Sequence, residues 1–119
     1  MARILLVGYI PALLEERERY LRAAGHDVTV AISFATASTA IQQNPIDVAI
    51  FGHTVPEEER NQLAAALKDA CPSAKIIMRY LTSVNNTKFA DALMPSTATA
   101  DEMLRAINHL ISKSRERMK

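Results

Sequence analysis

The fold is decided by the stretch Asn44–Gly52, which reads NPIDVAIFG. Its centre, Val48–Phe51, is an unbroken apolar run of strand length, and such runs are typical of strands buried on both faces of a parallel sheet. Asn44 and Pro45 stop a preceding helix, and Gly52 closes the strand. The stretch therefore predicts a helix, a short loop and a buried strand in succession, which is the repeating unit of an α/β protein.

The same alternation occurs five times along the chain. Strands are expected at residues 4–7, 27–31, 48–51, 75–80 and 92–94, and a helical pattern follows each of them. Pro11 suits a first helical turn, Ser33 suits an N-cap, and capping-box spacing joins Thr54 to Glu57 and Thr99 to Glu102. The expected buried stripes of three helices are Leu14, Leu21 and Ala24; Ala37, Ala40 and Ile41; and Leu63, Leu67 and Ala70.

Composition narrows the class of protein. The chain has 119 residues, 49% of them apolar, which is enough for one domain with one core. Fourteen Lys and Arg against thirteen Asp and Glu give a net charge of +1, so neither nucleic acid nor a membrane surface is an expected partner. A single cysteine excludes an internal disulfide framework and a cysteine-based zinc site. Charges soon interrupt the first apolar run, so neither a signal peptide nor a membrane span is expected, and we expect a cytoplasmic protein.

Right-handed crossovers between parallel strands leave chiefly a doubly wound sheet. Ligands of such sheets bind beyond the carboxyl ends of the strands. Function is therefore expected near Gly8 and Tyr9 after the first strand, Gly52 and His53 after the third, Arg79 in the fourth, and the residues after Met94.

The order and spacing of these segments resemble the CheY-like receiver domains of bacterial response regulators. The matching segments span nearly the whole chain: residues 3–7, Pro11, LRAAGHDV at 21–28, NPIDV at 44–48, Val55-Pro56, ADALMP at 90–95 and DEML at 101–104. The resemblance implies a flavodoxin-like (βα)5 fold with strand order 2-1-3-4-5. It also implies a receiver-like domain over residues 1–112, followed by a basic C-terminal helix end or tail over residues 113–119.

The resemblance breaks at the positions that carry the family's chemistry. The acidic pair that holds the metal falls on Gly8 and Tyr9, the phosphoacceptor Asp on Gly52, the switch Ser or Thr on Arg79, and the conserved Lys on Ser96. The switch aromatic residue falls on Leu93. Metal-assisted phosphoryl transfer needs oxygen ligands and a carboxylate acceptor, so no catalytic residue, metal site or cofactor is expected. The chain between Arg79 and Ser96 is also short for the family, which predicts a shortened fourth helix near residues 84–89.

Several interpretations of these positions stay open. Gly8 and Gly52 either open a pocket or fill space left by lost acidic side chains. Tyr9 either stacks on a ligand or plugs that pocket. Arg79 either holds an anion near helix N-termini, pairs with Glu57 or Glu58, or is a solvated strand end.

The sequence predicts a stand-alone pseudo-receiver of two-component or phosphorelay signalling that is not an enzyme and acts by protein–protein interaction. Its expected partner is a histidine kinase, a response regulator or another signalling protein, and a homodimer is compatible with this function. The alternative is a ligand-gated pseudo-receiver that binds an anion or small molecule near Arg79 and Tyr9.

Overall fold

The computed structural model describes residues 2–81 and 88–117, and the side chains of residues 2–81 and 88–112. Five strands and four helices lie in these ranges. In chain order they are β1 Arg3–Val7, α1 Pro11–Ala23, β2 Asp27–Ala31, α2 Phe34–Gln43, β3 Val48–Phe51, α3 Glu57–Ala70, β4 Lys75–Tyr80, β5 Ala92–Pro95 and α4 Ala100–Arg117. The five strands predicted from the sequence are all present, two of them one residue longer than expected.

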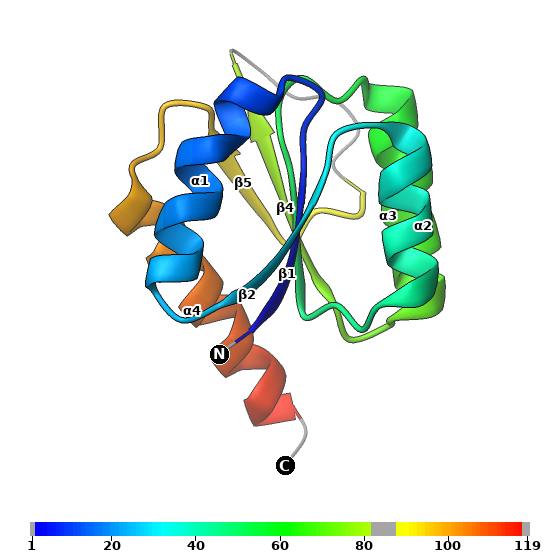
Figure 1. Ribbon diagram of the computed structural model, residues 1–119. Helices are drawn as coiled ribbons and strands as arrows, with labels where there is room; N and C mark the ends of the chain where they lie inside the picture. The colour runs from blue at the N-terminus through cyan, green and yellow to red at the C-terminus, as the bar shows by residue number, and fades with distance from the viewer. Residues whose placement is uncertain (1, 82–87, 118–119) are drawn as a thin grey trace.

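The strands form one parallel sheet in the order β2-β1-β3-β4-β5, as predicted. Figure 1 shows α1 and α4 on one face of the sheet and α2 and α3 on the other. Successive residues of a strand point to opposite faces, so the central strands β1, β3 and β4 each contribute to two cores. Leu5, Ala49 and Met78 belong to the core under α2 and α3, whereas Leu6, Ile50 and Ile77 belong to the core under α1 and α4. This double burial explains why the strands are apolar without alternation.

Local signals set most of the helix ends. Pro11 begins α1, and Gly25 follows its end with a φ of 91°, a conformation that glycine adopts without steric cost. Ser33 caps α2 through the backbone N–H of Thr36, and Thr99 and Glu102 form the predicted capping box before α4. These three predictions are confirmed.

The capping box predicted for Thr54 and Glu57 is wrong. Helix α3 begins at Glu57 with Pro56 as its N-cap, and no side chain caps it. The Thr54 hydroxyl instead accepts a hydrogen bond from the backbone N–H of Tyr9 at 2.9 Å. A long-range contact between two loops has therefore replaced a local one.

Two stripe positions were also wrong. Ala24 and Ala70 are exposed because each lies at or just beyond the last turn of its helix, where the chain leaves the sheet. In α3 the stripe instead includes Ala64 and Arg60, which is 6% exposed. The remaining stripe residues, Leu14, Leu21, Ala37, Ala40, Ile41, Leu63 and Leu67, are buried as predicted.

The predicted helix at residues 84–89 lies mostly outside the described residues. Its last two residues, 88 and 89, are described and form a turn. Helix α4 is the last helix of the sequence pattern, and it continues past residue 112 to Arg117. Among the described residues, no helix has the length and apolar character needed to cross a membrane.

Candidate functional site at the carboxyl ends of the strands

The fold brings most of the predicted site positions to one edge of the sheet. Gly8, Gly52 and Ser96 directly follow β1, β3 and β5. The backbone N–H groups of Gly8 and Gly52 extend the strand pairing by donating to Ala31 and Val7 at 3.1 and 2.8 Å. Parallel strands end at the same edge, so this cluster lies where ligands of doubly wound sheets bind.

The two glycines occupy tightly packed positions. A Cβ built on Gly8 would lie 2.7 Å from Cδ2 of Leu14, so the Leu14 side chain fills the space above it. A Cβ on Gly52 would lie 3.2 Å from the carbonyl oxygen of Val7 and 3.8 Å from Nη1 of Arg17. These contacts favour the space-filling interpretation of Gly8, and they show that the Arg17 guanidinium reaches the side-chain direction of Gly52.

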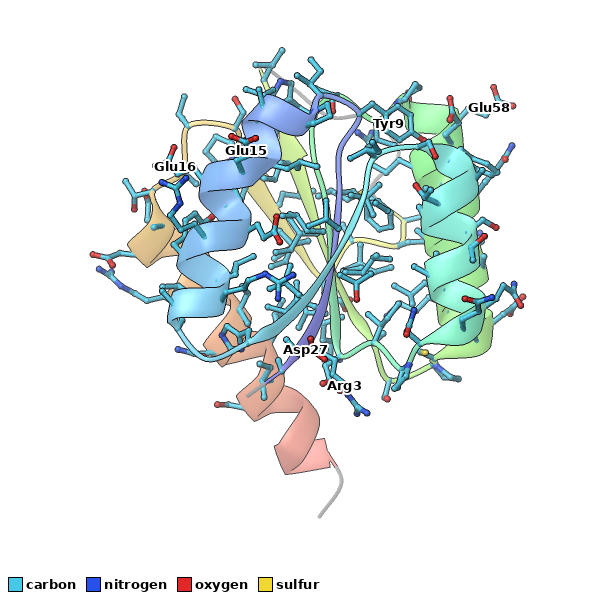
Figure 2. The ribbon with its side chains drawn as sticks, viewed as in Figure 1. Arg3, Tyr9, Glu15, Glu16, Asp27 and Glu58 are labelled. Carbon is cyan, nitrogen blue, oxygen red and sulfur yellow. The ribbon has the colours of Figure 1, made fainter. Side chains whose placement is uncertain are left out.

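Tyr9 lies toward the opposite face from Arg79. Its ring is partly buried against the core under α2 and α3, and its hydroxyl donates to Oε1 of Glu59 at 2.8 Å. Burial, followed by this hydrogen bond, raises the pKa of Tyr9 to about 12. Figure 2 shows Tyr9 near the start of α3, well away from Glu16 on the outer side of α1. Of the two interpretations of Tyr9, this placement favours the one in which the ring fills space.

Arg79 is almost completely buried, with 1% of its surface exposed. Its Nη2 atom donates to the carbonyl oxygens of Ser96, Pro95 and Ala98 at 2.8, 3.2 and 3.4 Å. The guanidinium therefore ties β4 to the loop between β5 and α4. A solvated strand end is thus wrong for Arg79, because β5, α1 and this loop enclose it.

The proposed pairing of Arg79 with Glu57 or Glu58 is also wrong. Within residues 2–81 and 88–112, no carboxylate lies within 4.0 Å of the Arg79 guanidinium. Glu57 and Glu58 belong to the first turn of α3, which covers the other face of the sheet. The sequence placed these groups at one edge but did not determine which face each would take.

A cavity of about 250 Å³ adjoins Arg79. It lies between α1 and the β5–α4 loop, and its polar lining includes Glu16, Arg17, Tyr20, Ser96 and Thr99 as well as Arg79. Burial and then repulsion from Arg79 lower the pKa of Arg17, and burial lowers the pKa of Arg79. Two guanidinium groups thus share one sparsely solvated space.

The same positive charge affects the pKa of His53. Burial lowers its pKa first, and the nearby charges of Arg17 and Arg79 lower it further. Its Nδ1 atom is buried and has no hydrogen-bond partner among the described residues. The site is therefore electropositive at the positions where a metal-dependent phosphoacceptor site would need negative charge.

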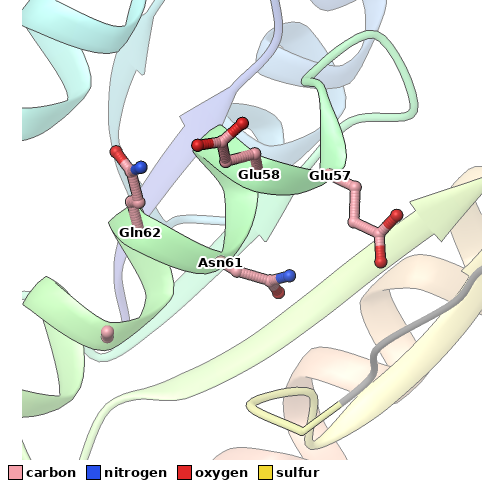
Figure 3. Close-up of a pocket in the computed structure, with 5 residues that line it drawn as sticks. Glu57, Glu58, Asn61 and Gln62 are labelled. Carbon is pink, nitrogen blue, oxygen red and sulfur yellow. The ribbon is translucent and has the colours of Figure 1, made fainter.

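Another hollow, of about 500 Å³, lies along α3 and is shown in Figure 3. Its lining comes entirely from that helix and includes Glu57, Glu58, Asn61 and Gln62. The side chains of Glu57 and Glu58 point in different directions in this view. Because binding sites need polar groups that converge from several elements, the Arg79 cavity is the stronger candidate.

Two aspartates lie at the amino-terminal edge of the sheet. Asp47 precedes β3 and pairs with Arg3 at 3.3 Å, and Asp27 begins β2 at the same edge (Figure 2). Among the described residues, no group of three or more His, Cys, Asp or Glu side chains comes together as a metal site would require.

Comparison with solved structures identifies the fold as that of response-regulator receiver domains. A CheY-like receiver domain from Methanospirillum hungatei JF-1 superposes with a TM-score of 0.88 at 23% identity, over 98% of both chains. The response regulator TrrA from Thermotoga maritima, in complex with Mg²⁺-BeF, has a TM-score of 0.80 at 22% identity, over 92% of this chain and 99% of that one.

A structure described as an adenylate cyclase from Rhodopirellula baltica is also similar, with a TM-score of 0.83 at 20% identity, over 98% of this chain and 92% of that one. No protein-family model matches the sequence, and no curated protein matches it. At these identities the likeness establishes the fold.

The sequence interpretation missed Arg17 and Tyr20 as site residues. Both lie on α1, and Arg17 stands three residues after the buried Leu14, on the side of the helix that faces the sheet. A cation at this spacing on an otherwise apolar stripe is the signal that could have identified Arg17. Tyr20 carries no comparable signal, because aromatic residues are common next to a core stripe.

Proposed function

We propose that this protein is a pseudo-receiver, a receiver-type domain of two-component or phosphorelay signalling that works without a phosphoacceptor aspartate. One observation carries the proposal. On a receiver fold, the carboxyl edge of the sheet presents Gly8, Gly52 and two guanidinium groups where metal-dependent phosphorylation needs carboxylates. A hard divalent cation prefers oxygen ligands, and the positive charge of Arg17 and Arg79 opposes its binding.

The proposed mode of action is contact with another protein rather than catalysis. Four exposed apolar side chains surround the same edge: Ile10, Leu13, Ile32 and Leu81, with 48%, 40%, 49% and 66% of their surfaces exposed. They follow or flank the ends of β1, β2 and β4. Grouped apolar exposure of this kind is typical of an interaction surface. The partner that we propose is a cytoplasmic signalling protein, such as a histidine kinase or a response regulator, rather than nucleic acid or a membrane.

The phosphorylation claim is tested by amide NMR titration with Mg²⁺ and beryllofluoride, a mimic of the phosphorylated state. We expect no Mg²⁺-dependent, saturable shift of Gly52, His53 or Ser96. The Thermotoga maritima regulator, whose structure contains Mg²⁺-BeF, serves as the positive control. A saturable shift at Gly52 that requires Mg²⁺ would contradict the proposal. A shift that does not require Mg²⁺ would indicate anion binding alone.

The contact surface is tested with purified histidine kinases from the organism that encodes the chain. Leu13→Glu should weaken binding at the carboxyl edge of the sheet. The matched control, Leu93→Glu, changes an apolar residue of β5 that is similarly exposed, at 45% against 40%. Equal loss in both variants would argue against this surface.

A second candidate function is a pseudo-receiver gated by a small ligand. The cavity beside Arg79 favours it, although Tyr9 lies elsewhere and Arg17 and Tyr20 take the place that the sequence had given to Tyr9.

A further inference from the structure

The cavity between α1 and the β5–α4 loop combines features that are costly for the fold. Arg17 and Arg79 both line it; Arg79 is buried and Arg17 half-buried, and repulsion from Arg79 adds to the cost of burying Arg17. Buried charges in proteins are normally paired with an opposite charge or coordinate an ion.

Arg79 supplies the decisive observation. Only 1% of its surface is exposed, and its Nη2 atom donates to the carbonyl oxygens of Pro95, Ser96 and Ala98. Among the described residues its Nε–H has no acceptor, and no carboxylate lies at ion-pair distance. Neutral carbonyl groups orient the guanidinium, and Tyr20 favours its charged form, but among the described residues no carboxylate balances its charge.

The N-terminus of α4 borders the same space, although its first turn carries Asp101 and Glu102, and Glu102 accepts the Thr99 N–H at 3.0 Å. Thr99 and Ala100 both line the cavity and stand at the start of this helix of 18 residues. The first N–H groups of a helix carry a partial positive charge and bind anions. Glu16 is the one carboxylate in the lining, and it is exposed on the outer side of α1. The enclosed part of the cavity is therefore electropositive.

We propose that this cavity binds a small oxyanion of the phosphate class, held between the guanidinium groups of Arg17 and Arg79. The volume of about 250 Å³ suits a small anion, since pockets for drug-sized ligands usually start near 300 Å³. Arg fits this ligand because its planar fork donates two parallel hydrogen bonds to a phosphate. The inference rests on the second candidate function above, and it names the ligand class and the residues that hold it.

Binding would link three elements of the fold. Arg17 comes from α1, Arg79 from β4, and Thr99 stands between β5 and α4. Because Leu13 also lines this cavity and belongs to the proposed contact surface, an anion here lies next to the surface that a protein partner would meet. The bound anion would thus stabilise one arrangement of α1 against the β5–α4 loop.

The test is an amide NMR titration with inorganic phosphate, with ionic strength held constant by sodium chloride. We expect saturable shifts at Ser96, Thr99 and Ala100, with a Kd near or below about 1 mM. Arg17→Gln should raise this Kd at least about tenfold, because it removes one of the two cations. The matched control is Arg19→Gln, which removes the same charge from an exposed position of the same helix and should leave the Kd unchanged.

Further titrations define the chemistry of the ligand. Sulfate should compete with phosphate, and the monovalent carboxylate acetate should bind more weakly. Shifts that remain linear with concentration, an unchanged Kd in Arg17→Gln, or tighter binding of acetate would each overturn the proposal. Arg79→Met provides a second variant, whose amide spectrum first establishes that it is folded. A negative phosphate result leaves the beryllofluoride test unaffected, so the two proposals can fail separately.

Discussion

The two edges of the sheet differ in whether their charged side chains form ion pairs. At the amino-terminal edge, Asp47 pairs with Arg3 at 3.3 Å and Asp91 pairs with Lys68 at 3.4 Å. Each carboxylate also accepts a backbone N–H at 2.8 Å, from Arg3 and from Ile76. At the carboxyl-terminal edge, Arg17 and Arg79 have no carboxylate partner within the described residues.

This difference separates an edge with a structural role from the edge at which we propose the functional site. Paired charges at the amino-terminal edge satisfy backbone donors and hold the strand starts in register. Uncompensated cations at the other edge cost stability, and proteins tend to break local rules of this kind at functional sites. The positive edge also coincides with the exposed apolar residues Ile10, Leu13, Ile32 and Leu81. Charge and apolar exposure thus point to the same end of the molecule.

The largest effect should come from removing Arg79. Arg79→Ala deletes a buried side chain and leaves the loop carbonyls of Pro95, Ser96 and Ala98 without their donor. We expect the free energy of unfolding to fall by about 2–4 kcal/mol, as measured by urea denaturation. A loss below about 1 kcal/mol would mean that the cost of burying the charge offsets these contacts.

A carboxylate introduced at the carboxyl edge of the sheet should give Arg17 an ion-pair partner and so remove most of the difference in charge pairing between the two edges. In Gly52→Asp the new Cβ lies 3.8 Å from Nη1 of Arg17, within reach of an ion pair, although it also lies close to the carbonyl of Val7. We expect phosphate affinity to fall at least about tenfold in NMR titrations. Gly52→Asn has nearly the same size without the charge, so it should lose less affinity. Equal losses would show that crowding, not charge, is responsible.

Removing a carboxylate from the paired edge should have a smaller effect. Asp47→Asn should lower the free energy of unfolding by up to about 1 kcal/mol, since both partners are partly exposed. Burial raises the pKa of Asp47, but hydrogen bonds and charge from Arg3 outweigh it and hold the pKa below 3.8. The ion pair therefore stabilises the fold above pH 3.8, and this contribution disappears as pH falls through the lower folded-state pKa.

Chemical denaturation from pH 7 down to pH 2 measures this difference. The stabilities of the wild type and Asp47→Asn should converge at the acidic end. A constant difference over the whole range would indicate lost packing instead of a lost charge.

The smallest expected effect concerns His53. Burial and the charges of Arg17 and Arg79 lower its pKa, so Arg17→Gln should raise that pKa toward 6.5. An NMR titration of the imidazole resonances measures the shift, and Arg19→Gln again serves as the control. An unchanged His53 pKa in Arg17→Gln would show that the two groups do not share an electrostatic environment.

Much of the fold could be predicted because its signals are local. Apolar runs identified the five strands, and Pro11, Ser33 and Thr99 marked helix starts through local signals. Thr54 was misinterpreted because its hydroxyl bonds to Tyr9, a residue 45 positions away. Helix capping follows from neighbours in sequence, whereas a contact between loops does not.

The sequence by itself determined a parallel sheet with helices on both faces and the absence of acidic residues at Gly8, Tyr9 and Gly52, and its resemblance to receiver domains supplied the strand order. Only the tertiary structure decided which side chains share the remaining site. It placed Tyr9 against α3, turned Arg79 toward α1 and brought Arg17 beside it. The physical reason is that the position of a residue after a strand predicts the edge of the sheet at which it lies. The side chains that it meets there depend on the packing of helices distant in sequence.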